Sequence, residues 1–461
     1  MESLSTELVT NIVHFCELPE LMNLRQSCKA FYAPATRQIF SHIHVTPEPD
    51  SLGDVGDDSD ENTKSEDFYK NFNSILSSSQ LSSEVTSIKI TTSNDPNKDK
   101  QDYNNDEEES ILTEGFEEVI RSISKFPNLR DVAVEFACVC MLDDDPDDWW
   151  KMKAEESAEF RYDVLRTLFS ALNETPKLRS LSLKHLQNYN DRRLITSPSF
   201  KPVLERLTEL RLKIVTEYET SSPESSWDIP QMYTFFHEFP DLWLKPTQNN
   251  LTSLTLHADL YWGYMPLCDF RSLHFPKLKK LELGNYAFTH DWQLDWILSH
   301  DTLEELVLDD AVITNYIYGY GPLDNENYPL EPIGGSYDNA HFWEYPRSWS
   351  EYFSKIEQQL PNLKVFKFGN GNWDEGRNFD YGKWNAMGVE GALERYKGFD
   401  KGTGPSPWVE LDEMIQEMEN GRFEPQGWQG VGKNRMIESL DEDTAAYEKL
   451  MNTIKARAGK T

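Results

Sequence analysis

One short pattern of apolar and polar residues recurs along the middle of the chain. Each copy reads apolar-x-x-apolar-x-apolar, and the two-residue spacing at its end is typical of a strand with one buried face. Eight segments fit this pattern: VTSIKI (85–90), LRDVAV (129–134), LRSLSL (178–183), LTELRL (207–212), LTSLTL (251–256), LKKLEL (278–283), LEELVL (303–308) and LKVFKF (363–368). Several are preceded by a Pro two residues before the first apolar position, as in FPNL, TPKL, FPKL and LPNL. A single copy is a weak signal, but eight copies predict a repeated strand unit.

The segments between these strands carry apolar residues at helical spacing in several places. Three stripes precede the second, third and eighth units: Phe116, Val119, Ile120 and Ile123; Leu165, Leu168, Phe169 and Leu172; and Phe353, Ile356 and Leu360. Strand, helix and strand in short succession resembles a leucine-rich-repeat solenoid, whose strands line a concave face and whose helices cover the convex face. The units that begin at 251, 278 and 303 are 27 and 25 residues apart, within the range of about 20–29 residues for such repeats.

The repeats are degenerate, so a second fold stays open. The Asn that usually follows the last Leu of such a repeat by three residues is missing, and the gap from 308 to 363 is much longer than one repeat. We expect an α/β protein with a leucine-rich-repeat-like solenoid over residues 81–370. The alternative for this region is an ordinary α/β domain.

The first 45 residues predict three short helices. The first has one apolar face, formed by Leu8, Ile12 and Cys16 with Val9 and Val13 beside them. The second is expected to open at Pro19 and to carry Leu21, Leu24, Cys28 and Phe31 at helical spacing, and the third to start near Pro34. A unit of about 40 residues is too small to bury three apolar faces by itself. It must therefore pack against the rest of the chain or against a partner.

Four motifs follow one another in residues 4–45: Leu-x-x-Glu-Leu, Leu-x-x-Leu-Arg, Cys-Lys-x-Phe-Tyr and Ile-Phe-Ser-His-Ile-His. In this order they resemble an F-box, the helical module that docks on the Skp-type adaptor of cullin–RING ubiquitin ligases. The segment departs from the family at Ser5, where Pro is usual, although serine can still cap a helix. The resemblance implies an adaptor-binding set of side chains: Leu4, Leu8, Ile12, Leu21, Leu24, Cys28 and Phe31. The alternative is an ordinary N-terminal helical subdomain over residues 1–45.

Acidic segments with few large apolar side chains interrupt the chain at 47–67, 94–110 and 143–148. Such segments cannot supply a core, so we interpret them as solvated loops, with residues 46–80 as an acidic linker and lead-in to the repeats. The segment 143–148 lacks the ligand spacing of a calcium loop.

Two further segments depart from the repeat. Residues 313–352 form an insertion rich in Tyr, Gly and Pro, whose aromatic residues either pack it onto the repeats or bind a partner. Residues 371–461 are expected to form a C-terminal cap or tail, and parts of them resemble the tails of fungal F-box proteins with degenerate leucine-rich repeats. Ala446, Leu450 and Ile454 form the apolar stripe of a terminal capping helix there.

Composition excludes several functional classes. With 79 acidic against 45 basic residues, the formal net charge is −34, which disfavours binding to nucleic acid or to an anionic membrane surface. The longest apolar run, residues 136–142, is far shorter than the roughly 20 residues of a membrane helix, and no signal peptide is evident. Five cysteines without a C-x-x-C motif fit reduced thiols of a cytoplasmic or nuclear protein better than a disulfide framework or a zinc site.

The sequence predicts no catalytic residues, no metal and no cofactor. His42 and His44 alternate with apolar residues and are expected to face solvent as a pair. Cys138 and Cys140 share one face of an expected strand, where inert thiols are more common than a redox pair. Carboxylates are so abundant that no acid–base pair can be singled out.

The F-box resemblance implies a non-catalytic, substrate-recognition subunit of a Skp–cullin–F-box ubiquitin ligase. The alternatives are an F-box scaffold that assembles a complex without promoting ubiquitination, and an enzyme seated in the long insertions. Along the expected concave face, basic residues fall on adjacent repeats with a histidine beside them: Lys184, Arg211, Lys213 and His257. We expect these residues to bind an acidic or phosphorylated segment of an unknown protein substrate. The alternative is that they only balance neighbouring carboxylates.

Overall fold

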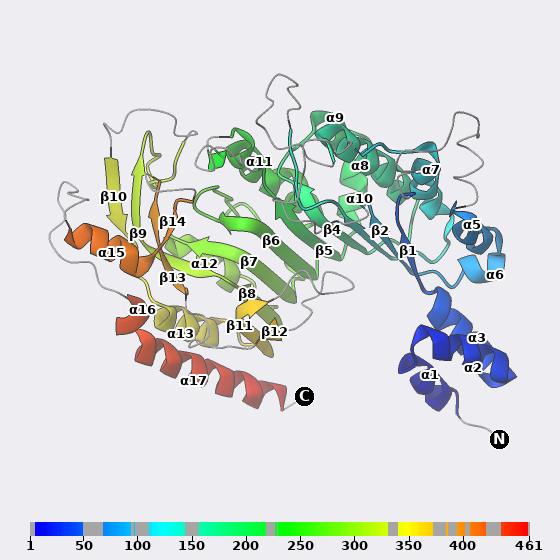
Figure 1. Ribbon diagram of the computed structural model, residues 1–461. Helices are drawn as coiled ribbons and strands as arrows, with labels where there is room; N and C mark the ends of the chain where they lie inside the picture. The colour runs from blue at the N-terminus through cyan, green and yellow to red at the C-terminus, as the bar shows by residue number, and fades with distance from the viewer. Residues whose placement is uncertain are drawn as a thin grey trace.

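The computed structural model describes residues 5–48, 68–93, 96, 110–142, 156–217, 226–227, 229–330, 340–371, 384–385, 394–401, 406–420 and 435–459. These residues form an α/β protein with three N-terminal helices and a large, mostly parallel sheet (Figure 1). The acidic segment 47–67 from residue 49 onward, segment 143–148, and nearly all of 94–110 lie outside the described residues.

Nine parallel strands follow one another in sequence order across the sheet. They are β1 (His42–Val45), β2 (Ser87–Thr91), β3 (Asp131–Glu135), β4 (Ser180–Gln187), β5 (Glu209–Val215), β6 (Ser253–Trp262), β7 (Lys280–Phe288), β8 (Glu305–Asp309) and β11 (Val365–Gly371). Each pairs with the next. All eight predicted units are therefore confirmed as strands. The structure adds β1, which carries the exposed His42 and His44 as predicted.

In-register pairing joins the apolar positions of the repeats into two continuous rows on one face of the sheet. One row holds Ile88, Val132, Leu181, Leu210, Leu254, Leu281, Leu306 and Phe366, and the other holds Ile90, Val134, Leu183, Leu212, Leu256, Leu283, Leu308 and Phe368. None of these side chains is more than 3% exposed. Since full burial of such a side chain contributes roughly 1.5–3 kcal/mol, these rows form the centre of the core.

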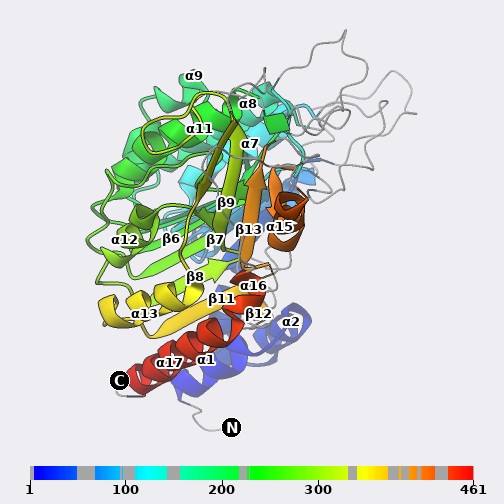
Figure 2. The same ribbon diagram turned by 90° about the vertical axis from the view of Figure 1, so that its left-hand side faces the viewer.

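Helices between the parallel strands lie along the face that carries these apolar rows (Figure 2). The three predicted stripes are confirmed as α7 (Glu114–Ser122), α8 (Ala158–Asn173) and α13 (Trp349–Gln359), with side-chain caps from Thr113, Ser157 and Ser348. The other described helices between β1 and α13 are α5 (Lys70–Ser77), α6 (Ser79–Ser82), η2 (Ile123–Lys125), α9 (Arg192–Ile195), α10 (Phe200–Glu205), α11 (Gln231–Phe239), η4 (Pro240–Leu244), η5 (Lys245–Thr247) and α12 (Asp291–Leu298). Among the described helices, none is long and apolar enough to cross a bilayer.

The N-terminal helices are α1 (Thr6–His14), α2 (Leu18–Ser27) and α3 (Lys29–Phe40). Ser5 caps α1, as its position predicted. The predicted boundary between the second and third helices is wrong. Cys28 adopts an extended conformation that ends α2 and lets α3 begin at Lys29. Pro34 consequently lies inside α3, where its missing N–H leaves one carbonyl of the first turn without a helical partner.

The C-terminal part adds a second group of strands that the sequence did not predict. They are β9 (Val312–Tyr320), β10 (Ala340–Glu344), β13 (Tyr396–Asp400) and β14 (Trp408–Glu410), and the short β12 (Trp384–Asn385) pairs with β11. Strand β9 pairs with the end of β7, with β10 and with β13. Part of the insertion 313–352 is therefore regular sheet, whereas 331–339 lie outside the described residues.

The chain ends in α15 (Leu411–Glu419), α16 (Arg435–Glu438) and α17 (Leu440–Ala458). Helix α17 packs against α13 and β11, the last parallel strand in the sheet order, whereas α1–α3 lie beside β1, the first strand in that order (Figure 1). Leu450 and Ile454 are buried in this contact and Ala446 packs against it, which confirms the predicted apolar stripe.

Candidate functional site

Helices α1–α3 form a small module with a core of its own. Val13, Leu21 and Ala35 are buried together, and Cys16, Phe31 and Ile39 pack around them. The module joins the sheet where Ser41, directly after α3, accepts hydrogen bonds from the backbone of Thr86 and Ser87. This core is much smaller than that of the sheet, so the module has little apolar contact to stabilise it alone.

The same module carries a large share of the exposed large apolar side chains in the described part of the chain. Half of the twelve large apolar side chains that are exposed in the described part of the chain fall within residues 8–32: Leu8, Ile12, Phe15, Leu18, Met22 and Tyr32. Leu8 is 51% and Phe15 is 83% exposed. Single exposed apolar residues are ordinary, but six within one small module favour a protein-interaction surface there.

The structure divides the predicted adaptor-binding set between the surface and the core of the module. Leu8 and Ile12 are exposed, and Leu24 and Cys28 are half-buried. Leu21 lies in the core, and Phe31 packs against it. Leu4 lies outside the described residues. We therefore still expect the side chains at the surface of the module to contact the adaptor. Leu21 is part of the core of the module and stabilises the module itself.

Sequence reasoning missed Phe15, Leu18 and Met22. Leu8, Ile12 and Phe15 recur at i, i+4 and i+7, while Val9, Val13 and Cys16 repeat the same spacing one residue later. Helix α1 thus carries two adjacent apolar stripes, and the second one faces the core. The spacing of Leu8, Ile12 and Phe15 was the available signal.

The second candidate surface is the polar face of the parallel sheet, opposite the apolar rows. The residues that alternate with the core positions align across the strands in three rows. The row nearest the carboxyl ends of the strands runs Thr91, Glu135, Lys184, Lys213, His257, Gly284 and Asp309. The structure therefore brings three of the four predicted substrate-binding residues into one row, and Arg211 lies in the row beside it.

Ion pairs within the sheet occupy part of this row. The Lys184 ammonium lies 2.7 Å from Glu135, and Lys89 lies 2.6 Å from the other oxygen of the same carboxylate. Burial acts to raise the pKa of Glu135, but hydrogen bonds from Lys184 and Lys89 outweigh it and lower that pKa. Lys184 is only 3% exposed, so its ammonium group pairs with Glu135 inside the protein and is not presented to a substrate at the surface.

Polar side chains on the same face also pair with one another on β6 and β7. Thr255 donates a 2.8 Å hydrogen bond to Glu282, and Lys280 lies 2.7 Å from Glu282. Arg211 and Lys213 are half-buried, whereas His257 is buried. Of the predicted cations, Arg211 and Lys213 are thus the ones whose side chains reach the surface.

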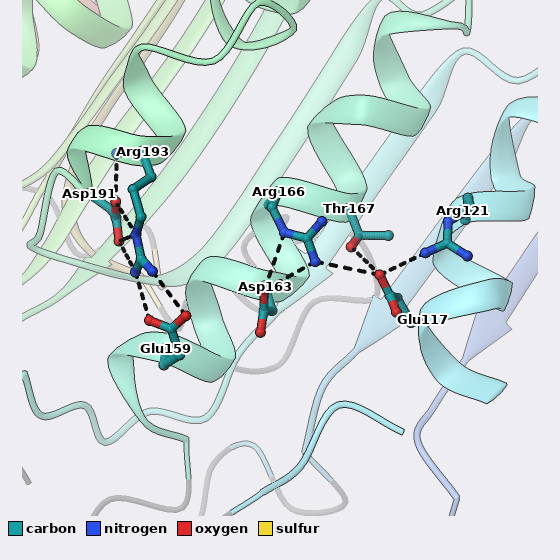
Figure 3. A network of polar contacts seen from close by, with 8 residues as sticks. All are labelled: Glu117, Arg121, Glu159, Asp163, Arg166, Thr167, Asp191 and Arg193. Atoms are coloured by element: carbon teal, nitrogen blue, oxygen red, sulfur yellow. Dashed lines mark hydrogen bonds and ion pairs between the residues drawn. The ribbon is translucent and has the colours of Figure 1, made fainter. Parts of the chain in front are cut away.

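The helix-covered face carries a different charged network, shown in Figure 3. Arg193 contacts Glu159 at 2.7 Å and Asp191 at 2.7 Å. Arg166 contacts Asp163 at 3.1 Å and Glu117 at 3.6 Å, and Glu117 also pairs with Arg121 and accepts a hydrogen bond from Thr167. Every cation in this network has a carboxylate partner, so it ties α7, α8 and α9 together and leaves little net charge for a ligand.

The aromatic residues of the insertion are largely packing residues. Trp349 and Tyr316 are buried, and Trp343 packs partly exposed beside Tyr264 and His290. In the described part of the insertion, these aromatic residues therefore pack against the rest of the protein, which is the alternative to a partner-binding role.

Reactive groups are sparse among the described residues. None of the five cysteines forms a disulfide, and burial raises the pKa of Cys268 well above its ordinary value. No group of three His, Cys, Asp or Glu side chains in the described ranges is placed to hold a metal ion. The sequence matches no protein-family model and no curated protein.

Proposed function

We propose that this chain is the substrate-recognition subunit of a Skp–cullin–F-box ubiquitin ligase. In this proposal α1–α3 are the F-box that docks on a Skp-type adaptor. The parallel repeats form a leucine-rich-repeat-like solenoid that holds a protein substrate. The observation that supports this most is the N-terminal module, which combines a core of three buried side chains with an exposed apolar surface.

The energetics of the module favour a docking role. Interface free energy concentrates in a few apolar anchors that become fully desolvated, each worth about 2 kcal/mol or more on truncation. Leu8 and Ile12 lie one turn apart on α1, Phe15 is the residue that caps its C-terminus, and Leu18 and Met22 lie on α2, the next helix in the chain. A partner that covers them removes this surface from water and adds the stability that the small core lacks.

In this role the chain performs no bond chemistry. Holding a substrate near a ubiquitin-charged enzyme raises the effective concentration of the reacting groups, which accelerates transfer without a catalytic side chain. The polar face of the sheet is the proposed place for the substrate, with Arg211 and Lys213 as the surface cations toward an acidic or phosphorylated segment. Both cations lie on β5, two residues apart on this face, in two adjacent in-register rows of the sheet.

Co-expression with a Skp-type adaptor tests the docking step. The Leu8→Asp/Ile12→Asp variant should lose adaptor capture at least tenfold, because each Asp would be buried without a partner in the complex. The matched control, Val365→Asp/Ile437→Asp, adds the same charges at exposed apolar residues outside the module and should capture adaptor as the wild type does. Adaptor capture by the Leu8→Asp/Ile12→Asp variant at the level of the control variant would contradict the F-box proposal. Co-purification of a cullin then separates a ligase subunit from a scaffold.

A further inference from the structure

A row of exposed cations borders the sheet at the amino ends of its strands. The residues directly before the strands form a backbone ladder: Ser41, Thr86, Arg130, Arg179, Thr208, Thr252, Lys279, Glu304 and Lys364, each carbonyl accepting from the next strand. The turns that lead into this ladder are the FPNL, TPKL and FPKL segments of the repeat. These turns and the end of α10 place cations along this edge. Two of them, Lys279 and Lys364, pair with Glu304 of the ladder. The other five are named here the basic edge: Arg130, Lys177, Arg179, Arg206 and Lys277. Four of these side chains are exposed and Arg206 is half-buried.

The two lysines of the basic edge donate hydrogen bonds to neutral groups. Lys177 donates to the side-chain amide oxygen of Asn128 at 2.5 Å, and Lys277 donates to that of Asn250 at 3.1 Å. Amide oxygens orient an ammonium without cancelling its charge. Each of these ammonium groups is therefore oriented by a neutral partner and not by a carboxylate.

Two arginines of the basic edge, Arg179 and Arg206, are oriented in the same way, whereas the charge of the exposed Arg130 acts on the neighbouring Asp131 carboxylate. Arg179 donates to the backbone carbonyls of Pro176 and Leu178. Arg206 donates to the last carbonyls of α8, including that of Asn173 at 3.2 Å, where a cation also complements the helix dipole. None of the ion pairs between described residues includes a member of the basic edge, although Asp131 and Glu174 lie nearby in sequence.

This arrangement differs from the charged groups on the two faces of the sheet. On the polar face Lys184 is paired with Glu135, and on the helix-covered face Arg193 is paired with Glu159. In a chain with a formal charge of −34, the basic edge gathers five cations that form no ion pair among the described residues. It creates a local positive potential that favours an anionic partner.

We infer that the basic edge is a binding site for an acidic protein segment. A chain rich in Asp or Glu supplies flexible carboxylates that can reach cations spread along several strands, which lie about 4.8 Å apart. A nucleic acid fits less well, because a long phosphate backbone would meet the negative potential of the whole molecule. Arg130 lies two strands, or about 10 Å, from the end of α3, so a partner on the N-terminal module would lie beside the bound segment. The inference does not depend on the proposed function.

Binding of a labelled twelve-residue poly-glutamate peptide to the purified chain tests this site. Fluorescence polarisation at 50 mM and 300 mM NaCl should show binding that weakens with salt. Arg130→Gln/Lys177→Gln/Arg179→Gln should weaken binding about tenfold, since three exposed charge contacts are lost. The matched control, Arg166→Gln/Lys201→Gln/Lys245→Gln, has the same net charge but replaces cations paired with carboxylates, and should bind within about twofold of wild type.

Three results would overturn the inference: absence of peptide binding at 50 mM salt, equal loss in both triple variants, or binding of a labelled twelve-nucleotide oligothymidylate as tight as that of the peptide. Circular dichroism of each variant confirms that the fold is retained, which is expected because the replaced side chains are at the surface.

Discussion

Lys184 and Glu135 lie opposite each other on β4 and β3, and their charged atoms are 2.7 Å apart although both side chains are nearly fully buried. Lys184 was predicted to face a substrate, and the structure instead shows it engaged within the sheet. Burying an ion pair costs the desolvation of both groups, so the pair itself adds little net stability. Removing one partner is strongly destabilising, because the other charge stays buried without its partner.

Lys184→Met is expected to destabilise the protein by about 3 kcal/mol, because it leaves the buried Glu135 carboxylate with less compensation. Lys89 still contacts Glu135, which keeps the loss below that of an isolated buried charge. Urea unfolding measures the change. The double variant Lys184→Met/Glu135→Gln should recover most of the loss, and a double variant as unstable as Lys184→Met would show that packing, and not charge, is responsible.

His185 predicts a specific pH dependence of stability. It sits at the irregularity in β4 with a φ of 58°, and its Nδ1 lies 2.7 Å from the carbonyl of Phe136. Burial, together with the charge of Lys213, lowers the pKa of His185 to about 3. The folded state therefore binds fewer protons than the unfolded state between the ordinary pKa of 6.5 and about pH 3, and stability falls as pH falls through this window.

The His185→Asn variant should reduce this slope by up to about 1.4 kcal/mol per pH unit, since Asn does not titrate and tolerates the left-handed backbone. Unfolding in urea at pH 7, 6 and 5 gives the slope for each protein. In the wild type the His185 ring resonance should stay constant from pH 7 to 5. A ring that titrates near pH 6.5 would contradict the assigned burial.

The N-terminal module offers a direct contrast between core and surface. Leu21→Ala should destabilise the module by about 3 kcal/mol, the usual result of truncating a buried Leu. Leu8→Ala, at an exposed position of the same module, should change stability by less than about 0.5 kcal/mol. Hydrogen exchange measured by peptide should show faster exchange confined to residues 6–40 in Leu21→Ala. Similar exchange in both variants would show that Leu21 is not a core residue.

Asp443 attaches the C-terminal helix to the remainder of the protein. Its carboxylate is fully buried and accepts from Arg395 at 3.1 Å, from the Tyr396 hydroxyl at 2.9 Å and from the backbone of Ser350 at 2.8 Å. Asp443→Ala leaves Arg395 buried without this charge, at an expected cost of about 3–5 kcal/mol. Limited proteolysis should then release α17 first. Asp441→Ala, at an exposed position of the same helix, is the control and should resist cleavage as the wild type does.

The predicted polar surfaces show where local pattern was sufficient and where it was not. Alternation placed Lys184, Lys213 and His257 on one face correctly, because every strand side chain alternates with period two. Alternation carries no information on the neighbouring strand, so it could not reveal that Glu135 lies beside Lys184 and neutralises it. The unpaired state of the basic edge likewise depends on which turns lie side by side.

By itself the sequence determined the eight strand units, the helices that precede several of them and their parallel succession, because these depend on side-chain periodicity within short segments. Only the tertiary structure decided which stripe of α1 faces inward, since Val9 and Leu8 begin equally good stripes one residue apart and packing against α2 and α3 selects one. It also decided that β13 returns to pair with β9 across some 80 residues of sequence. That pairing joins backbone groups far apart in the chain, and its free energy depends on contacts that no local pattern contains.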